Sequence, residues 1–182
     1  MKIKKIAIDP GHGGRDPGVV SNKYREKDIN LLLATELFSQ LLKSAYNPLL
    51  LREGDLSMTL ANRVKKAADW QADLFISIHH NGHSNNQARG TETYHFPSSL
   101  IGQQAARVMQ QELVNLLAIP DRGVKSSSSF YVLRHTPMPA VLLEPLFLTN
   151  SLDRNTLICK NYFSKVSHSL FKALEQLNQS IK

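Results

Sequence analysis

Histidine and glutamate side chains at the ends of apolar segments are the residues of this chain best suited to metal or acid–base chemistry. His12 follows the apolar segment Ile6–Ile8 within Pro-Gly-His-Gly-Gly, a run that can neither continue a strand nor begin a helix. His79 and His80 end a second apolar segment, and Glu144 ends a third. Because sites in open α/β sheets form beyond the carboxyl ends of the strands, the sequence predicts that these groups meet at one edge of a sheet.

Two imidazoles and one carboxylate around a metal leave one position open for water, which is the usual pattern of catalytic zinc. Zinc lowers the pKa of that water toward neutrality and polarises a carbonyl group. A second carboxylate that is not a ligand can then act as general base and later as general acid. Glu144 suits this role, since a carboxyl group at the end of a buried strand tends to have a raised pKa. The alternative is that Glu144 is a buried ion-pair partner, for instance of Arg134.

Local pattern leaves the identity of the other ligands open. Adjacent strand residues point to opposite faces, so His79 and His80 are not expected to reach one metal together. The remaining one, and His83 in the following loop, would be surface or supporting residues. Asp28 is predicted to open a helix, and Glu26 just before it is locally better explained as another acidic residue at the helix start than as a ligand.

Apolar periodicity predicts strands that alternate with helices through much of the chain. The predicted strands are residues 3–9, 47–52, 73–78, 90–96, 130–133 and 140–143. The predicted helices are residues 29–43, one capped by Ser57 or Thr59, one starting at Ser98 or Ser99, and one from about Asn161 to the end. The serine-rich segment 120–129 between them is predicted to be a mobile loop.

This alternation predicts an α/β fold with a mostly parallel sheet and helices on both faces. The link between segments 130–133 and 140–143 is too short for a helical crossover. These two segments are therefore predicted to pair antiparallel, which makes the sheet mixed.

Composition indicates a single domain over residues 1–182 with a sizeable core. The formal net charge of +7 attracts polyanions such as an anionic cell wall. Because the basic residues are scattered and not interleaved with aromatics, we expect no nucleic-acid partner. The single Cys159 excludes an internal disulfide and a multi-cysteine metal site. We find no apolar run long enough to span a membrane and no apolar signal segment, so the chain is expected to stay in the cell, leave by another route or be an excised domain.

Short motifs recur in order nearly from end to end of the chain. They are Ile8-Asp-Pro-Gly-His-Gly-Gly14 with Asp16 and Gly18, Glu26-Lys-Asp-Ile-Asn-Leu31, Leu51-Arg52, Arg63, Leu74-Phe-Ile-Ser-Ile-His79 with Asn81, Gly90-Thr-Glu-Thr-Tyr94, Val132-Leu-Arg134, Met138-Pro-Ala-Val-Leu-Leu-Glu144 and Phe147-Leu-Thr-Asn150. Together these motifs closely resemble the zinc-dependent N-acetylmuramoyl-L-alanine amidases of the family called amidase type 3.

The resemblance implies a role for each of the candidate residues. It places the zinc ligands on His12, Glu26 and His79 and the catalytic glutamate on Glu144. It also implies an open α/β sandwich with a six-stranded sheet. The implied reaction is hydrolysis of the amide between the lactyl group of N-acetylmuramic acid and L-alanine of the stem peptide. We expect zinc-bound water to attack the carbonyl and Glu144 to carry the proton to the leaving amine.

Asn81, Arg63 and Arg134 are further candidates, for orienting the substrate or supporting groups of the site. The chain departs from the family pattern in Pro145-Leu146 after the glutamate, and in His80 and His83 where small residues are common. These departures bear on substrate detail more than on the chemistry.

The organisation of the chain adds expectations about how it works. We see no long insertion of the kind that carries an autoinhibitory helix, so the domain is expected to be active without an activator. It is expected to bind peptidoglycan through its basic surface as a monomer, in the periplasm or outside the cell. A lone catalytic domain without a signal segment resembles a phage or prophage endolysin released through a holin. The alternatives are a zinc peptidase acting on stem peptides and a non-catalytic peptidoglycan-binding module.

Overall fold

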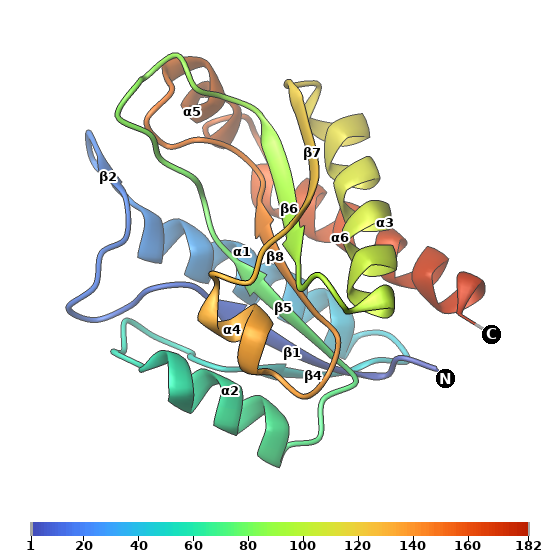
Figure 1. The fold of residues 1–182 in the computed structure, drawn as a ribbon. Coiled ribbons are helices and arrows are strands. Elements are labelled where there is room, and N and C mark those ends of the chain that lie inside the picture. The colour runs from blue at the N-terminus through green and yellow to red at the C-terminus, as the bar shows by residue number, and fades with distance from the viewer. Residues whose placement is uncertain (1, 182) are drawn as a thin grey trace.

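A six-stranded twisted sheet forms the centre of the structure, a computed structural model that describes residues 2–181 (Figure 1). The strands of this sheet are β1 Lys5–Pro10, β4 Asn47–Leu50, β5 Leu74–Ile78, β6 Thr91–His95, β7 Asp121–Ser126 and β8 Ala140–Glu144. Outside it lie the strands β2 Val20–Ser21 and β3 Tyr24–Arg25. The helices are α1 Glu26–Leu42, α2 Leu60–Asp69, α3 Leu100–Leu117, α4 Tyr131–His135, α5 Ser151–Leu157 and α6 Tyr162–Ser180. The short strands β2 and β3 form a separate hairpin that leads into α1.

The main sheet has the strand order β4-β1-β5-β8-β6-β7. Every neighbouring pair is parallel except β6 and β8, which are antiparallel. The prediction of a mostly parallel, mixed, six-stranded sheet with helices on both faces is therefore confirmed. The carboxyl ends of β1, β5 and β8 lie at the same edge, because these three central strands run in one direction.

Two predicted elements are wrong, and both corrections concern the region between α3 and β8. Residues 130–133 are not a strand, because Phe130 precedes helix α4, in which Val132 and Leu133 are both buried. A four-residue apolar run cannot distinguish a buried strand from a short helix. The antiparallel partner of β8 is instead β6, with Thr93 opposite Leu143.

The segment 120–129 was predicted to be a loop, but residues Asp121–Ser126 form β7, which pairs parallel to β6. This strand lies at the edge of the sheet, and its ends are exposed to solvent. Edge strands commonly carry charged residues, which remove the apolar signal by which a buried strand is found in a sequence.

Capping residues define where several helices begin. Thr59 accepts a hydrogen bond from the Asn62 amide and caps α2, and Ser99 caps α3 in the same way. Helix α1 begins at Glu26 and not after Asp28, so both acidic residues lie in its first turn. Helix α5 was not predicted from the sequence, although Asn150 caps it.

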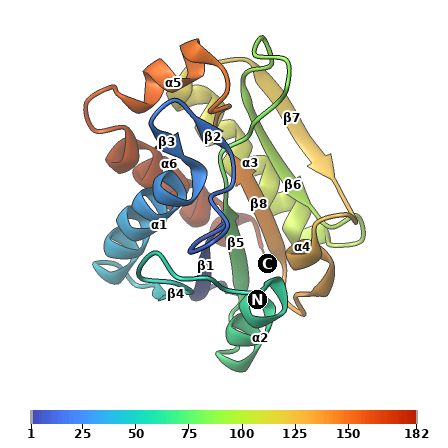
Figure 2. The ribbon, with the colours of Figure 1, turned by 90° about the vertical axis from the view of Figure 1, so that its left-hand side faces the viewer.

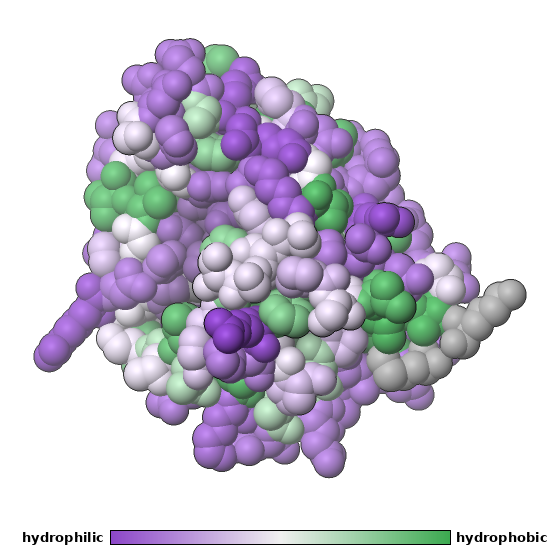
Figure 3. All heavy atoms as spheres, in the orientation of Figure 1, coloured by the Kyte–Doolittle hydropathy of each residue, from purple (hydrophilic) through white to green (hydrophobic). Residues whose placement is uncertain are grey.

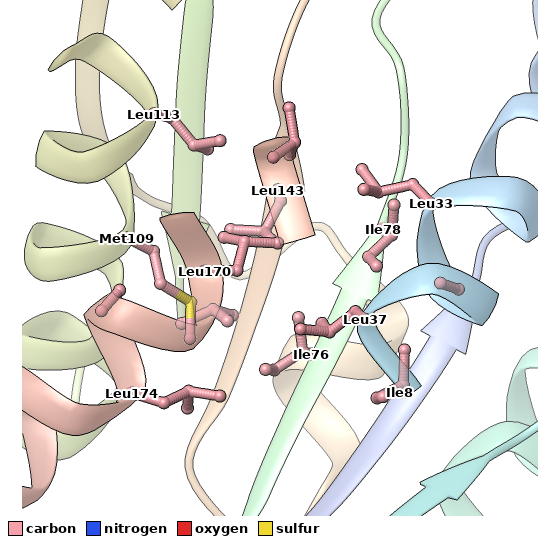
Figure 4. Close-up of a cluster of buried hydrophobic side chains, with 14 of the residues drawn as sticks. Ile8, Leu33, Leu37, Ile76, Ile78, Met109, Leu113, Leu143, Leu170 and Leu174 are labelled. Atoms are coloured by element: carbon pink, nitrogen blue, oxygen red, sulfur yellow. The ribbon is translucent and has the colours of Figure 1, made fainter. Parts of the chain in front are cut away.

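The larger part of the core lies between one face of the sheet and helices α1, α3 and α6 (Figure 4). Ile8, Ile76 and Leu143 project from three neighbouring strands toward Leu37 of α1 and Leu170 of α6. The opposite face is covered by the shorter helices α2 and α4, with α4 on the far side of the sheet from α1 and α6 in Figure 2. This smaller cover leaves room for an open cavity on that face.

None of the helices in residues 2–181 is long and apolar enough to cross a membrane. The face shown in Figure 3 is mostly hydrophilic and is hollowed beside the α4 segment.

Candidate metal centre

The first candidate ligand, His12, is displayed on the loop that follows β1. Its backbone adopts the left-handed conformation with φ of 61°, which is uncommon for a residue other than glycine. The Gly11 amide donates to Ile78 O at 2.9 Å, so the start of the loop is attached to the end of β5. Backbone strain of this kind is concentrated at functional sites, where the surrounding structure holds it in place.

The second candidate, Glu26, enters the site as the first residue of α1. Its amide donates to Val19 O at 2.8 Å, which anchors the helix start to the end of the glycine-containing loop. Its carboxylate accepts hydrogen bonds from the Val19 amide at 2.9 Å and the His80 amide at 3.1 Å. Glu26 is thus both an acidic residue at a helix start and part of the site, so the two readings of the sequence do not compete.

His79 and His80 diverge at the end of β5. His79 Nδ1 lies 2.9 Å from Glu26 Oε1, on the face of the sheet covered by α2 and α4. His80 is fully buried on the opposite side, where its ring contacts Asn30 and Tyr162. The expectation that neighbouring strand residues face opposite ways is confirmed, and His79 is the one that joins the cluster.

His12, Glu26 and His79 converge so closely that their potential ligand atoms all lie within 4.8 Å of one another. His12 Nε2 is 3.0 Å from Glu26 Oε2, and the two imidazole rings meet edge to face with centroids 4.8 Å apart. The second ring nitrogen of His12, Nδ1, lies 2.7 Å from Asp16 Oδ2. A carboxylate on the far nitrogen is the usual partner that orients a metal-binding histidine.

Two glycines are needed because the loop approaches the ligands so closely. A Cβ atom on Gly11 would lie 2.3 Å from His79 Nε2, and one on Gly18 would lie 2.5 Å from Glu26 Oε2. Gly18 also has a positive φ of 63°. A side chain at either position would displace a ligand, so these glycines determine the shape of the cluster.

The charges of the cluster favour a bound cation. Burial raises the pKa of Glu26, but hydrogen bonds from His12 and His79 outweigh it and hold that pKa well below its usual range. Glu26 is therefore a buried carboxylate anion between two imidazoles. Two nitrogen donors and one carboxylate are a set that zinc accepts, and the Asp16 contact supplies the expected outer support. The donor chemistry of this cluster therefore fits a zinc ion.

Glu144, the candidate catalytic residue, lies on the strand next to His79. The His79 amide donates to Leu143 O at 2.9 Å, so Glu144 directly follows the residue that pairs with His79. Burial raises the pKa of Glu144 well above its usual range, and the negative charges of Glu26 and Glu92 add to the shift. Within residues 2–181 its Oε2 is buried and has no hydrogen-bond partner. A carboxyl group in this state is suited to exchanging a proton with a bound reactant.

Glu92 explains part of that environment, because it lies directly opposite Glu144 in the antiparallel β6–β8 pair. Its carboxylate accepts hydrogen bonds from Arg122 Nε and Lys125 Nζ, both at 2.6 Å, and from Asn81 Nδ2 at 2.8 Å. Glu92 is thus an anion paired with Arg122 and Lys125, and it lies beside the Glu144 carboxyl, whose Oε2 has no partner within residues 2–181. Among residues 2–181 Glu144 forms no ion pair, which excludes the alternative of an ion pair with Arg134.

An open cavity of about 440 Å³ lies beside His12 and His79. Its polar wall includes Asp16 and Arg63, and its apolar wall includes residues of β8, of the start of α2 and of the segment leading into α4. Such a mixture of apolar surface and a few converging polar groups is typical of a substrate site. The hollow on the hydrophilic face in Figure 3 gives this cavity access to solvent.

The three predicted substrate residues are placed differently from one another. Arg63 lies in the cavity wall, but its guanidinium already donates to Asp9 Oδ1, Pro10 O and His12 O. Asn81 is tied to Glu92 and, through its Oδ1, to the Gly82 amide. Arg134 lies in α4 and lines a separate cavity, so the structure does not bring it to the cluster.

Arg52 supports the His12 loop, a role that the sequence did not indicate although Leu51-Arg52 is one of the matching motifs. This fully buried guanidinium donates to four backbone carbonyls, those of Pro10, Gly11, Lys27 and Gly54, at 2.8–3.0 Å. It therefore connects the loop after β1 to the first turn of α1. A buried arginine that bonds only backbone oxygens has no local sequence signature, apart from its place directly after an apolar strand.

Replacing Arg63 is expected to destabilise the fold. In Arg63→Met the carboxylate of Asp9, only 1% exposed, loses its cation and keeps the Ser77 hydroxyl as a donor. Breaking a buried ion pair in this way costs about 3–5 kcal/mol, measured as the free energy of unfolding in urea. Lys65→Met on the same helix removes an exposed pair with Asp69 and should leave stability almost unchanged. Equal losses in the two variants would contradict this role for Arg63.

The comparison with known proteins identifies relatives over most of this chain. A family model described as N-acetylmuramoyl-L-alanine amidase (amidase type 3) matches residues 6–176. The uncharacterized protein YqiI of Bacillus subtilis is 42% identical over 175 residues, covering 94% of this chain and 84% of YqiI. The N-acetylmuramoyl-L-alanine amidase LytC of the same organism is 38% identical, covering 91% of this chain but only 34% of LytC.

A solved structure agrees with these sequence matches. The catalytic domain of CwlV, an N-acetylmuramoyl-L-alanine amidase from Bacillus (Paenibacillus) polymyxa var. colistinus, superposes with a TM-score of 0.89 at 34% identity. The match covers 96% of this chain and 97% of that domain. The six-stranded architecture described above is therefore shared with an amidase catalytic domain.

Proposed function

Because the chain belongs to the amidase type 3 family of N-acetylmuramoyl-L-alanine amidases, we propose that its cluster is the zinc centre of a peptidoglycan amidase. The bond cleaved is the amide between N-acetylmuramic acid and L-alanine of the stem peptide. The single observation that supports this best is the convergence of His12, Glu26 and His79 beside Glu144, whose buried Oε2 has no hydrogen-bond partner within residues 2–181. We further propose that residues 1–182 act as one catalytic domain.

The residues of the cluster divide into metal ligands and a proton carrier. His12 through Nε2, His79 through Nδ1 and the carboxylate of Glu26 would hold the ion, and Asp16 would orient the His12 ring. Zinc bound there lowers the pKa of water and polarises a carbonyl oxygen. Glu144 takes the proton of the attacking water on its carboxylate and passes it to the nitrogen of L-alanine as the amide bond breaks.

The cavity beside the ligands is the proposed place of the muramyl peptide. Its open, partly apolar form suits a branched substrate that is presented on a polymer. The formal net charge of +7 would hold the protein near an anionic cell wall, and its effect should weaken as salt is added. We propose the cell wall as the place of action, while release by a phage lysis system and a monomeric state stay predictions.

Digestion of purified peptidoglycan tests this function, with the soluble products identified by mass spectrometry. With zinc present we expect free stem peptides that begin at L-alanine, together with glycan that lacks peptides. A chelator should abolish these products, and added zinc should restore them. Shortened stems still attached to glycan would show a peptidase instead. Zinc-loaded, folded protein that yields no products would favour a binding module.

A further inference from the structure

Three polar residues are buried together on the side of the sheet away from the cavity. His80 and Asn30 are fully buried and Tyr162 is 4% exposed. They come from three elements distant in the sequence, namely the end of β5, helix α1 and the first residue of α6. None of them takes part in the proposed reaction. Burying polar side chains is costly unless they are hydrogen-bonded, so their contacts call for an explanation.

The directions of the hydrogen bonds that link these residues can be assigned in order, starting from the bond that reaches Glu26. Asn30 Nδ2 contacts Glu26 Oε1 at 3.2 Å and Gly11 O at 3.3 Å. Both oxygens can only accept, so the nitrogen of the Asn30 amide must face them. The oxygen of that amide therefore faces His80 Nδ1, at 2.8 Å.

The remaining steps are then determined in turn. His80 Nδ1 must carry a proton to donate to Asn30. The partners of the two ring nitrogens are an amide oxygen and a phenol hydroxyl, so no anion balances a charge on this fully buried ring and it is neutral. The other nitrogen, Nε2, is therefore an acceptor, and it receives the hydroxyl proton of Tyr162 at 3.1 Å. A directed chain of hydrogen bonds thus runs from Tyr162 through His80 and Asn30 to Glu26.

We propose that Tyr162 and His80 are positioning residues of the metal centre, which orient the carboxylate of Glu26 through Asn30. The backbone supports the same end point, since the His80 amide also donates to Glu26 Oε1 at 3.1 Å. Removing the Tyr162 hydroxyl leaves the buried Nε2 of His80 without its donor and removes one of the two contacts that fix the ring. The ring is then free to turn, which loosens its Nδ1–H bond to the Asn30 oxygen and the hold of the Asn30 amide on Glu26.

This chain of hydrogen bonds connects the metal centre to the start of the C-terminal helix α6. Tyr162 is the first residue of α6, and the residue before it, Asn161, has a positive φ of 67°. Helix α6 packs along α1 and α3 in the main core (Figure 4). The inference rests on the proposed zinc site, and its test must separate a loss of metal affinity from a loss of stability.

The test compares Tyr162→Phe with Tyr46→Phe. Tyr46 is a matched control because it belongs to the same core cluster and its hydroxyl accepts a hydrogen bond from Asn178, away from the metal centre. Zinc affinity is measured on metal-free protein by competition with a chelating indicator. Asn30→Ala serves as a comparator, since it removes the direct donor to Glu26. The unfolding temperature of each metal-free variant is recorded in parallel.

Asn30→Ala is expected to weaken zinc binding by about 10- to 100-fold, the range found for outer partners of metal ligands. Tyr162 is two hydrogen bonds further from Glu26 than Asn30 is, so we expect Tyr162→Phe to lower zinc affinity by roughly 3- to 10-fold. Tyr46→Phe should bind zinc as the unaltered protein does. Nitrogen-15 NMR of the His80 ring in metal-free protein should show the Nδ1–H tautomer, and the Nε2 resonance should shift in Tyr162→Phe because that nitrogen loses its hydrogen bond.

Equal zinc affinity in Tyr162→Phe and Tyr46→Phe would overturn this inference while leaving the zinc centre intact. A His80 Nε2 resonance that is unchanged in Tyr162→Phe would overturn it as well. If the unaltered protein binds no zinc, the proposed metal centre itself fails, and the inference fails with it.

Discussion

Glu144→Gln is expected to lower kcat/KM for amide hydrolysis by about 10²- to 10⁴-fold, the usual contribution of a general acid–base group. Glutamine has nearly the same volume and can still form hydrogen bonds, but it cannot take a proton from water. The effect should fall on kcat, because the loss concerns proton transfer and not the surface that binds the substrate. The measurement is release of stem peptides over time at several substrate concentrations.

This variant should leave the protein folded and loaded with zinc. Glu144 is buried beside Glu26 and Glu92, and its Oε2 has no partner within residues 2–181. A neutral side chain removes the cost of charging that carboxyl, so metal-free Glu144→Gln should unfold at the same or a higher temperature. Stability and activity are thus expected to change in different directions, as is common at active sites.

Glu112→Gln is a matched control, since it makes the same chemical change on α3, on the other face of the sheet. It should retain full activity. If Glu144→Gln were as active as Glu112→Gln, Glu144 would not be the proton carrier. Loss of zinc from Glu144→Gln would instead place Glu144 among the ligands.

The His79→Ala variant is expected to lose zinc on dialysis and to be less active than the unaltered protein by roughly 10³-fold or more. This loss corresponds to several kcal/mol of metal stabilisation of the transition state. His79 supplies one of the two nitrogen donors of the cluster. The remaining donors, His12 and Glu26, leave the ion more open to water and to competing chelators. Zinc content by atomic spectroscopy and activity on peptidoglycan are the two measurements.

His83→Ala is the control for this second prediction, because His83 lies in the exposed loop after β5 and outside the cluster. It should keep both zinc and activity. Excess zinc should partly restore His79→Ala if weaker binding is the cause. Full activity of dialysed His79→Ala would contradict the assignment of His79 as a ligand.

Prediction from sequence succeeded where a local pattern has one structural solution. Apolar periodicity placed β1, β5, β8 and the long helices, and Thr59 and Ser99 proved to be the caps of α2 and α3. It failed at α4, where four apolar residues fit either state, and at β7, where an edge strand carries polar residues. These failures arise because a short segment takes its conformation from its neighbours in space.

By itself the sequence determined the types of the reactive residues, the strand ends that carry His12, His79 and Glu144, and the family to which the motifs point. The local pattern of Glu26 favoured a helix-start acid and the resemblance implied a ligand, but only the tertiary structure shows it joining the histidines from the first turn of α1. It also decided that Arg52 fastens the His12 loop and that His80 leads through Asn30 to Glu26. The physical reason is that periodicity and capping depend on neighbouring residues, whereas convergence of side chains depends on strand register and helix placement between distant segments.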